Sequence, residues 1–347
     1  MTRKWTSWLA AAALGCQAFG ASAVETRMVT ASERGTYIQI GRDLAKYVAP
    51  AAGMELTVLP SAGSAENVQR LRYEPGVKLA IVQSDVYQAF LDRVTGNAEA
   101  RTLIEPLRVI MSLYNEEIYF LVRADSNLNY LHEIKDARIN VGPLLSGTAM
   151  SATTLYRQMF GGPPPDTSTS FMTNEEALVH LTGDKTVDVV AVVAGQPAKL
   201  LADMKPEARQ LLKLLKFDPN QAASKEALKT YFPATVRQSS YPNLLTEDVP
   251  SLAVKAFLVT YDYKLGTTVD LMSKFGRSLC TNFSQLQSEG HPKWKEVDLA
   301  LPELRRGWTY YPTTAREMRR CMAEKVEAKA KPVSQCAQQE RILGLCK

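Results

Sequence analysis

The feature that most constrains the fold is a regular alternation of short apolar runs with segments of helical periodicity. Apolar residues at helical spacing, such as Ile38, Leu44 and Val48, predict a helix over residues 36–49. Strands alternating with helices are typical of an α/β fold with mainly parallel sheets. The expected strands are residues 24–31, 54–59, 79–82, 138–141 and 187–193, and the other expected helices are 64–73, 84–91, 148–160 and 174–181.

The alternation comes in two series, which indicates two lobes. Residues 108–113 and 118–123 read as two strands that join the series, and residues 253–260 read as a strand that returns the chain to the first sheet. A chain of 347 residues has room for two such units. We expect a first lobe over residues 24–120, completed by about 240–311, a second lobe over 121–239, and a tail over 312–347.

The first 23 residues look like an export signal. Arg3 and Lys4 precede an apolar stretch that closes on Ala21, Ser22 and Ala23, a small-x-small pattern. We expect cleavage after Ala23 and a periplasmic product. Two alternatives remain, namely a retained anchor helix and a lipoprotein modified at Cys16.

Four cysteines remain after such cleavage, and all of them lie in the last quarter of the chain. An even number in an exported chain favours two disulfides, and the spacings match no zinc-binding pattern. We expect residues 312–347 to form a helical hairpin that turns at residues 331–334. Its role would be to stabilise the fold as a disulfide staple or, alternatively, to dock a partner. A staple of Cys321 with Cys346 would leave Cys280 for Cys336, but all three possible connectivities stay open.

Charge and motifs argue against several classes of function. Loss of Arg3 and Lys4 with the leader lowers the formal net charge from +5 to +3, which is too mild for a nucleic-acid-binding surface. The chain has three histidines and lacks the HExxH, GxSxG, P-loop and GxGxxG motifs. We therefore expect no enzymatic activity, no cofactor and no metal site.

Small polar turns stand between expected strand ends and helix starts at four places. Such turns expose backbone N–H groups at the positive end of a helix, where a carboxylate can bind. Ligands of open α/β sheets bind beyond the carboxyl ends of the strands, so the turns would share one site. Helix capping is the ordinary role of any single turn of this kind. The turns are residues 32–37 (SERGTY), 61–67 (SAGSAEN), 83–85 (QSD) and 146–148 (SGT).

The ordered segments GTYIQIGRDLA, PSAGSAENVQRL, KLAIVQSDV, LRVIMSLYNEEIYFLVRADS and INVGPLLSGTAM resemble the TAXI-type substrate-binding proteins of TRAP transporters. The resemblance runs from about Met28 to about Tyr311. It implies a two-lobed periplasmic-binding-protein-like fold of type II, with a ligand cleft between the lobes and the helical C-terminal extension as an addition. It also implies a monomeric receptor without enzymatic activity. Such a receptor hands a small organic anion to an ion-gradient-driven TRAP permease.

The same resemblance implies the pocket and the ligand class. The ligand would be a dicarboxylate, a 2-oxo acid or an acidic amino acid. Backbone N–H groups near Ser64 and Thr148 would bind a carboxylate, the tyrosines would pack on the carbon skeleton, and Asp85 would accept from an amino group. Asp85 has helix capping as its alternative role, and Tyr114 has core packing. The expected ligand-binding residues are Thr36, Tyr37, Ser61, Gly63, Ser64, Asn67, Gln83, Ser84, Asp85, Tyr114, Ser146, Gly147, Thr148, Gly195 and Gln196.

A second interpretation keeps the same pocket but changes the partner. In it the chain is a ligand-sensing periplasmic binding protein that signals to a membrane histidine kinase. The two interpretations differ in the docking surface and not in the solute site.

Overall fold

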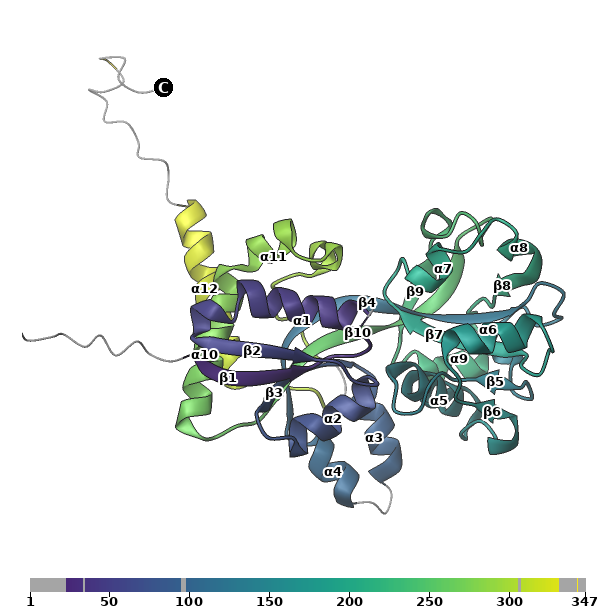
Figure 1. Ribbon diagram of the computed structural model, residues 1–347, viewed down its shortest axis with the longest axis horizontal. Coiled ribbons are helices and arrows are strands. Elements are labelled where there is room, and N and C mark those ends of the chain that lie inside the picture. Colours follow the sequence, from purple (N-terminus) through teal and green to yellow (C-terminus); the bar gives the residue numbers. More distant parts are fainter. Residues whose placement is uncertain (1–22, 34, 95–97, 305–306, 331–341, 343–347) are drawn as a thin grey trace, which may run out of the picture.

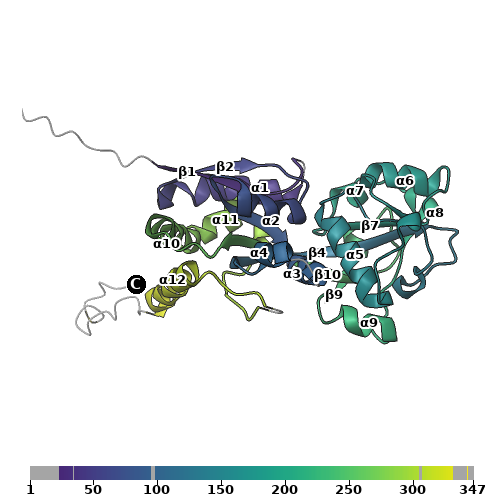
Figure 2. The same cartoon turned by 90° about the horizontal axis from the view of Figure 1, so that it is seen from below.

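A computed structural model describes residues 23–33, 35–94, 98–304, 307–330 and 342. Their strands form a ten-stranded sheet in the order β2-β1-β3-β10-β4-β7-β5-β6, with β8 added to β4 and β9 added to β10. Figures 1 and 2 show two groups of elements, which we call the first and the second lobe, with the long strands β4 and β10 running between them. The expected export signal lies outside the described residues, apart from Ala23.

The first lobe is built on three parallel strands. Helices cover both faces of these strands, as the alternation of strands and helices predicts. Helix α2 follows Gly63 and buries Ala65, Val68 and Leu71, which are spaced three residues apart and therefore share one face. The elements are β1 (Val24–Val29), α1 (Thr36–Tyr47), β2 (Met54–Leu59), α2 (Ser64–Tyr73), β3 (Val77–Gln83), α3 (Val86–Val94) and α4 (Ala98–Ile104).

The second lobe repeats this plan with shorter strands. Strands β5, β6 and β7 run parallel to one another. Helix α5 starts after Ser146, whose side chain accepts a hydrogen bond from the Ala149 N–H and so caps the helix. The elements are β5 (Ile139–Asn140), α5 (Gly147–Phe160), β6 (Thr169–Ser170), α6 (Asn174–Thr182), β7 (Val189–Ala194), α7 (Lys199–Ala202), α8 (Ala208–Leu211), β8 (Leu212–Leu214), α9 (Ala222–Ala227) and β9 (Phe232–Val236).

One uninterrupted strand joins the lobes where we expected two. Strand β4 (Leu107–Arg123) continues through Asn115, Glu116 and Glu117, which read as a break in the sequence. These residues pair antiparallel with Ala253–Lys255 of β10 (Val249–Tyr261), so the ladder carries polar residues that local propensity would place in a turn.

The sheet is mixed, and the expectation of mainly parallel sheets is wrong at its centre. Strand β10 runs antiparallel to both β3 and β4, and β4 runs antiparallel to β7. The parallel trios of the two lobes therefore flank an antiparallel pair. Residues 253–260 do return the chain to the first sheet, because β10 pairs with β3 along residues 256–259. The exact lobe boundaries at residues 120 and 239 stay predictions.

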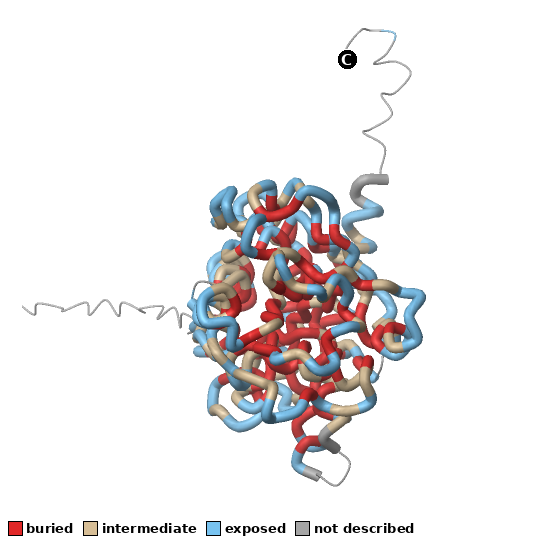
Figure 3. Tube along the Cα trace, turned by 90° about the vertical axis from the view of Figure 1, so that its right-hand side faces the viewer, coloured by how far each residue is buried: buried red, intermediate tan, exposed pale blue. Residues whose placement is uncertain are grey.

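Buried residues gather toward the middle of the molecule, and exposed residues lie at its outside (Figure 3). The apolar core of the first lobe divides into one layer under α1 and α10 and another under α2, α3 and α4. No helix of the described residues is both long enough and apolar enough to span a bilayer.

The C-terminal part of the described chain packs back on the first lobe. It comprises α10 (Gly266–Thr281), α11 (Phe283–Glu289), a 3₁₀ helix (Pro292–Glu296) and α12 (Pro312–Ala330). The absence of a side chain at Gly276 lets α10 approach the backbone of α12, since a Cβ at Gly276 would lie 2.9 Å from Thr314 Cα.

A disulfide joins Cys280 of α10 to Cys321 of α12. Of the three connectivities that the sequence leaves open, this disulfide excludes the staple of Cys321 with Cys346 and of Cys280 with Cys336. Two helices far apart in sequence pack side by side and bring the two Cα atoms to 6.3 Å, which the hairpin interpretation did not anticipate. Cys336, Cys346 and the expected turn at residues 331–334 lie outside the described residues.

Candidate functional site

The loops beyond the carboxyl ends of β2, β3 and β5 meet between the lobes. A Cβ at Gly63 would lie 2.9 Å from the backbone nitrogen of Gly147, and a Cβ at Gly147 would lie 2.2 Å from Gln83 Oε1. Three of the four predicted turns are thus in direct contact. The structure shows the lobes closed on each other at this point.

Gln83 connects the two lobes at the centre of this contact. Its side chain is buried, and its Oε1 accepts hydrogen bonds from Ser64 Oγ (3.4 Å) and from Ser151 Oγ on α5 (3.3 Å). The Gln83 backbone N–H donates to Ser64 Oγ at 3.0 Å. A residue expected to bind the ligand therefore also holds the lobes together.

Asp85 extends the contact between the lobes. The Tyr231 hydroxyl, from the second lobe, lies 3.0 Å from Asp85 Oδ2 and 3.0 Å from the Ser151 carbonyl oxygen. Burial raises the pKa of Asp85 to about 6, against an opposing effect of Ser151 and Tyr231. The other carboxylate oxygen, Oδ1, is buried without a hydrogen-bond partner.

Two adjacent carboxyl groups on β4 lie in the same region. Glu116 Oε2 accepts a hydrogen bond from the Tyr37 hydroxyl at 2.6 Å, and Glu117 Oε2 accepts one from the Gln196 backbone N–H at 2.8 Å. Burial raises the pKa of Glu116 to about 7, although the bonds from Tyr37 and Gln83 act in the opposite direction. Burial also raises the pKa of Glu117. Strand β4 thus carries two buried carboxyl groups that keep their protons to a higher pH than free glutamate does.

Tyr114 lies beside a buried ammonium group. The Lys293 Nζ atom is 5.5 Å from the centre of the Tyr114 ring and pairs with Glu296 at 2.7 Å. The backbone at Gly195 lies close to both side chains, because a Cβ there would lie 2.9 Å from Lys293 Cε and 3.2 Å from the Tyr114 ring. The Tyr114 hydroxyl is buried and makes no hydrogen bond of normal geometry. Burial raises its pKa, and the nearby Thr36 side chain acts in the opposite direction.

Several predicted site residues use their side chains to hold the scaffold. The Asn67 amide donates to the Thr30 and Ile81 carbonyl oxygens, and its Oδ1 accepts from Ser61 Oγ at 2.6 Å. Gln196 donates to the Thr235 carbonyl oxygen and accepts from the Arg237 N–H. These side chains shape the loops, and their own hydrogen-bonding capacity is largely used.

Three hydroxyl groups from the predicted list accept hydrogen bonds from backbone N–H groups of the scaffold. Ser146 caps α5, and Thr148 Oγ1 accepts from the Val193 backbone N–H at 3.3 Å. Ser84 Oγ accepts from the Lys255 N–H on β10 at 3.1 Å, which turns this side chain toward the sheet. Each of these hydroxyl oxygens accepts a bond, so its O–H stays able to donate to an anionic ligand.

Sequence reasoning missed four groups of this region: Ser151, Tyr231, Lys293 and the acidic pair Glu116–Glu117. The pair had a usable signal, because two adjacent acids interrupt an otherwise apolar run of strand residues, and buried acids cluster at functional sites. Ser151 stands one turn after Gly147 on the predicted helix, so helical spacing could have found it, whereas Tyr231 and Lys293 had no signal because only the tertiary fold brings their segments here.

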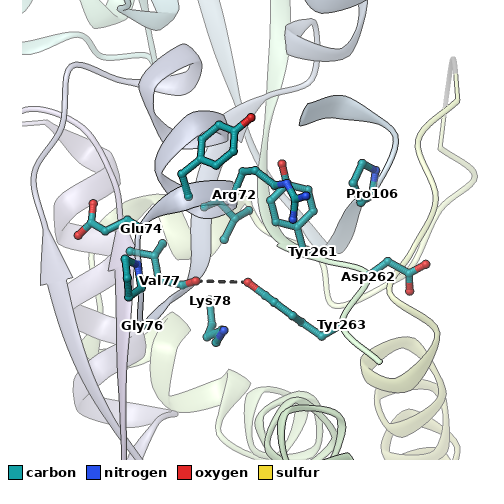
Figure 4. A pocket seen from close by; sticks show the side chains of 12 residues that line it. Arg72, Glu74, Gly76, Val77, Lys78, Pro106, Tyr261, Asp262 and Tyr263 are labelled. Atoms are coloured by element: carbon teal, nitrogen blue, oxygen red, sulfur yellow. Dashed lines mark hydrogen bonds between the residues drawn. The ribbon is translucent and has the colours of Figure 1, made fainter. Parts of the chain in front are cut away.

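Two cavities lie away from this contact. One of about 280 Å³ surrounds the amino end of β3, where the Tyr263 hydroxyl donates to the Val77 carbonyl oxygen and Arg72 lies over the Tyr261 ring (Figure 4). It is at the opposite end of β3 from Gln83, so we do not assign it to the site. A second, of about 480 Å³, lies beside residues 301–304 and α12. Among the residues that the structure describes, no group of three or more His, Cys, Asp or Glu is arranged to hold a metal ion.

A comparison with protein families finds one match, to a model described as the NMT1-like family, over residues 28–300. The match covers most of the chain and all the elements of the inter-lobe contact. The chain belongs to the NMT1-like family. The assignment to the TAXI type is finer than this match and stays a proposal.

Among solved structures, this NMT1-like chain is similar to three proteins of low identity. PhnD1 from Prochlorococcus marinus, in complex with methylphosphonate, is 12% identical with a TM-score of 0.46, covering 86% of this chain and 98% of that one. XAC2383 from Xanthomonas citri, bound to ATP, is 12% identical with a TM-score of 0.44 (88% and 99%). A TctC solute binding protein from Polaromonas is 16% identical with a TM-score of 0.38 (88% and 98%). At these values the likeness says nothing about the ligand of this chain.

Replacing Gly63 by alanine should open the lobes. Gly63 has a φ of +133° and touches the second lobe, so a side chain there adds backbone strain and meets the Gly147 nitrogen. The strain is local to the first lobe, so the contact with Gly147 is what disfavours closure, and a penalty of about 1.4 kcal/mol or more from it would lower the closed-to-open ratio at least roughly tenfold. Small-angle X-ray scattering should then give a larger radius of gyration than for the unmodified protein.

Gly161→Ala is the matched control for this test. Gly161 also has a positive φ, of +82°, but nothing lies within 4 Å of the added Cβ. Its radius of gyration should equal that of the unmodified protein. Equal values for all three proteins would contradict the closed contact at Gly63.

Proposed function

We propose that this chain is an extracytoplasmic receptor that binds a small organic acid between its lobes. Five buried side-chain polar atoms of the described residues lack a hydrogen-bond partner, and the observation that carries the proposal is that two of them, Asp85 Oδ1 and the Tyr114 hydroxyl oxygen, belong to the predicted pocket. Buried polar atoms in proteins almost always have hydrogen-bond partners, so a bound solute is the natural source of the missing ones. Both residues were expected in the pocket from sequence.

The charges of the region favour an acidic amino acid over a dicarboxylate or a 2-oxo acid. Asp85, Glu116 and Glu117 supply three buried carboxyl groups, whereas Lys293 is the buried ammonium of the region and is already paired with Glu296. A solute with only negative groups would be repelled by these acids. An ammonium group facing Asp85 and Glu116 would compensate them, and the solute carboxylates would take the backbone N–H groups that begin α2 and α5.

The proposed partner is a TRAP-type permease driven by an ion gradient. The resemblance of the ordered motifs to TAXI-type receptors supports this choice. With it come a leader cleaved after Ala23, a periplasmic location and a monomeric receptor that closes on its solute before delivery.

The experiment is a thermal-shift screen of the purified protein against acidic amino acids, dicarboxylates, 2-oxo acids and neutral controls. A solute at about 100 times its dissociation constant adds roughly 2.7 kcal/mol of stability, which is several degrees of melting temperature for a chain of this size. We expect glutamate or aspartate to give the largest shift. A flat response from protein that mass spectrometry shows to be free of solute would contradict the proposal.

Tyr114→Phe sharpens the test. The substitution removes a hydroxyl that makes no hydrogen bond of normal geometry within the protein, so the melting temperature of the free protein should change by less than about 2 °C while solute affinity falls about tenfold. Tyr263→Phe is the matched control, since the Tyr263 hydroxyl bonds to the Val77 carbonyl oxygen far from the site. Unchanged affinity in Tyr114→Phe would remove Tyr114 from the pocket.

A further inference from the structure

A cavity of about 240 Å³ lies between the lobes beside α3, and the solute site does not account for it. Its walls come from Ser112 of β4, from Lys255 and Phe257 of β10, from Tyr87 of α3, from Phe232 in the second lobe and from Trp308. The cavity shares only Ser84 with the predicted solute-binding residues. Ser84 turns its hydroxyl toward the Lys255 N–H of β10 and not toward the contact at Gly63 and Gly147.

Aromatic rings in a fixed arrangement form the apolar wall. The Trp308 ring lies 5.5 Å from the Tyr87 ring and 5.2 Å, edge to face, from the Phe257 ring. The Trp308 indole N–H donates to the Ser84 carbonyl oxygen at 2.8 Å, which fixes its orientation. Such a wall offers flat apolar surface with little conformational entropy left to lose, which suits an aromatic ligand.

Lys255 brings a positive charge into the same cavity. Its ammonium forms no ion pair with any carboxylate in the described part of the chain. Burial lowers its pKa, and no charged neighbour contributes to the shift. The other lysine of the cavity, Lys229, is already paired with Glu226. Glu303 also borders the cavity but is solvent-exposed. A half-buried ammonium without a counter-ion is costly unless an anion joins it.

We propose that this cavity binds a small aromatic carboxylate, with the ring against Trp308 and Phe257 and the carboxylate paired with Lys255. The volume lies below the roughly 300 Å³ at which pockets for drug-sized ligands begin, so a one-ring or fused two-ring acid fits. Because Phe232 and Thr230 of the second lobe complete the wall, the cavity exists when the lobes are closed. Its occupant would therefore stabilise the closed receptor from a site that the transported solute does not use.

Indole-3-acetate tests the proposal by isothermal titration calorimetry, with indole-3-acetamide as the uncharged analogue. We expect the unmodified protein to bind the acid at least about tenfold more tightly than the amide, because a charge-assisted bond to Lys255 is lost with the amide. Equal affinities, or no heat from the acid, would overturn the proposal. This comparison needs no substitution and is independent of whether any variant folds.

Variants then locate the site. Lys255→Met should weaken binding of indole-3-acetate about tenfold, whereas Lys264→Met, which removes an exposed lysine paired with Asp262, should leave it unchanged. Tyr114→Phe should also leave indole-3-acetate binding unchanged. If Tyr114→Phe lost binding of indole-3-acetate while Lys255→Met kept it, the compound would lie in the solute site. That result would overturn the inference and leave the proposed function intact.

Discussion

Replacing Cys280 and Cys321 by alanine should lower the free energy of unfolding by about 4 kcal/mol. The disulfide between them closes a loop with a sequence separation of 41 residues, so its loss restores a large amount of chain entropy to the unfolded state. For a chain of this size the melting temperature should fall by roughly 6 °C. Thermal and urea unfolding of oxidised protein and of the double variant measure the difference.

The loss should not detach α12. The close approach at Gly276 and the ion pair between Arg277 and Glu324 still hold α12 against α10 in the variant. Circular dichroism of the folded variant should therefore match that of the unmodified protein at 20 °C. The change is expected in stability and not in helix content.

Replacing Cys336 and Cys346 by serine is the control, together with peptide mapping of the oxidised protein without reduction. Mapping should recover the peptide that joins Cys280 to Cys321. A Cys321–Cys346 peptide, or an alanine double variant as stable as the unmodified protein, would show that α10 and α12 are not covalently joined.

Much of the first lobe could be predicted because its elements depend on local pattern. Strand β2 and helix α2 have the predicted bounds, since each is a short run with one clear periodicity between turn-forming residues. Strand β4 could not be predicted as one element, because its polar middle is held by β10 from more than 130 residues away. The antiparallel centre of the sheet escaped prediction for the same reason.

The candidate site was predictable where it depends on parallel strands ending at one edge. Gly63, Gln83 and Gly147 follow that rule, and the structure brings them into contact. The chemistry within these loops was harder to foresee, because hydroxyls and amides such as those of Thr148 and Gln196 are used by the scaffold. The buried charges come from the antiparallel strands and the C-terminal segment, which the alternating pattern does not describe.

Lowering the pH from about 8 to about 4.5 should stabilise the closed protein, and Glu116 should supply much of the effect. Its folded-state pKa is about 7, raised by burial from 4.5, so the folded protein binds more protons than the unfolded chain between these values. The stabilisation is complete below the unfolded pKa and is lost as the pH rises through about 7. A shift of this size corresponds to about 3 kcal/mol.

Urea unfolding at a series of pH values measures this dependence, and Glu116→Gln isolates it. The glutamine variant cannot titrate at this position, so its stability should vary less between pH 5 and 8, with the contributions of Asp85, whose pKa is about 6, and of Glu117, whose pKa burial also raises, remaining. Tyr37→Phe is the complementary variant. It removes a hydrogen bond that lowers the pKa of Glu116, so the loss of stability should move to higher pH. Identical profiles for the three proteins would show that Glu116 is solvated and the lobes are open.

The protonation of Glu116 also distinguishes the proposed solute classes, because it gives their affinities opposite dependences on pH. A solute whose ammonium faces Glu116 favours the ionised carboxylate, so its affinity should rise as the pH increases to about 7 and then level off. A purely anionic solute at the same place favours the protonated acid, so its affinity should fall over that range. In Glu116→Gln either slope should flatten. Dissociation constants measured between pH 5.5 and 8 thus decide whether the buried acids recognise an amino group or merely accept a proton when an anion enters.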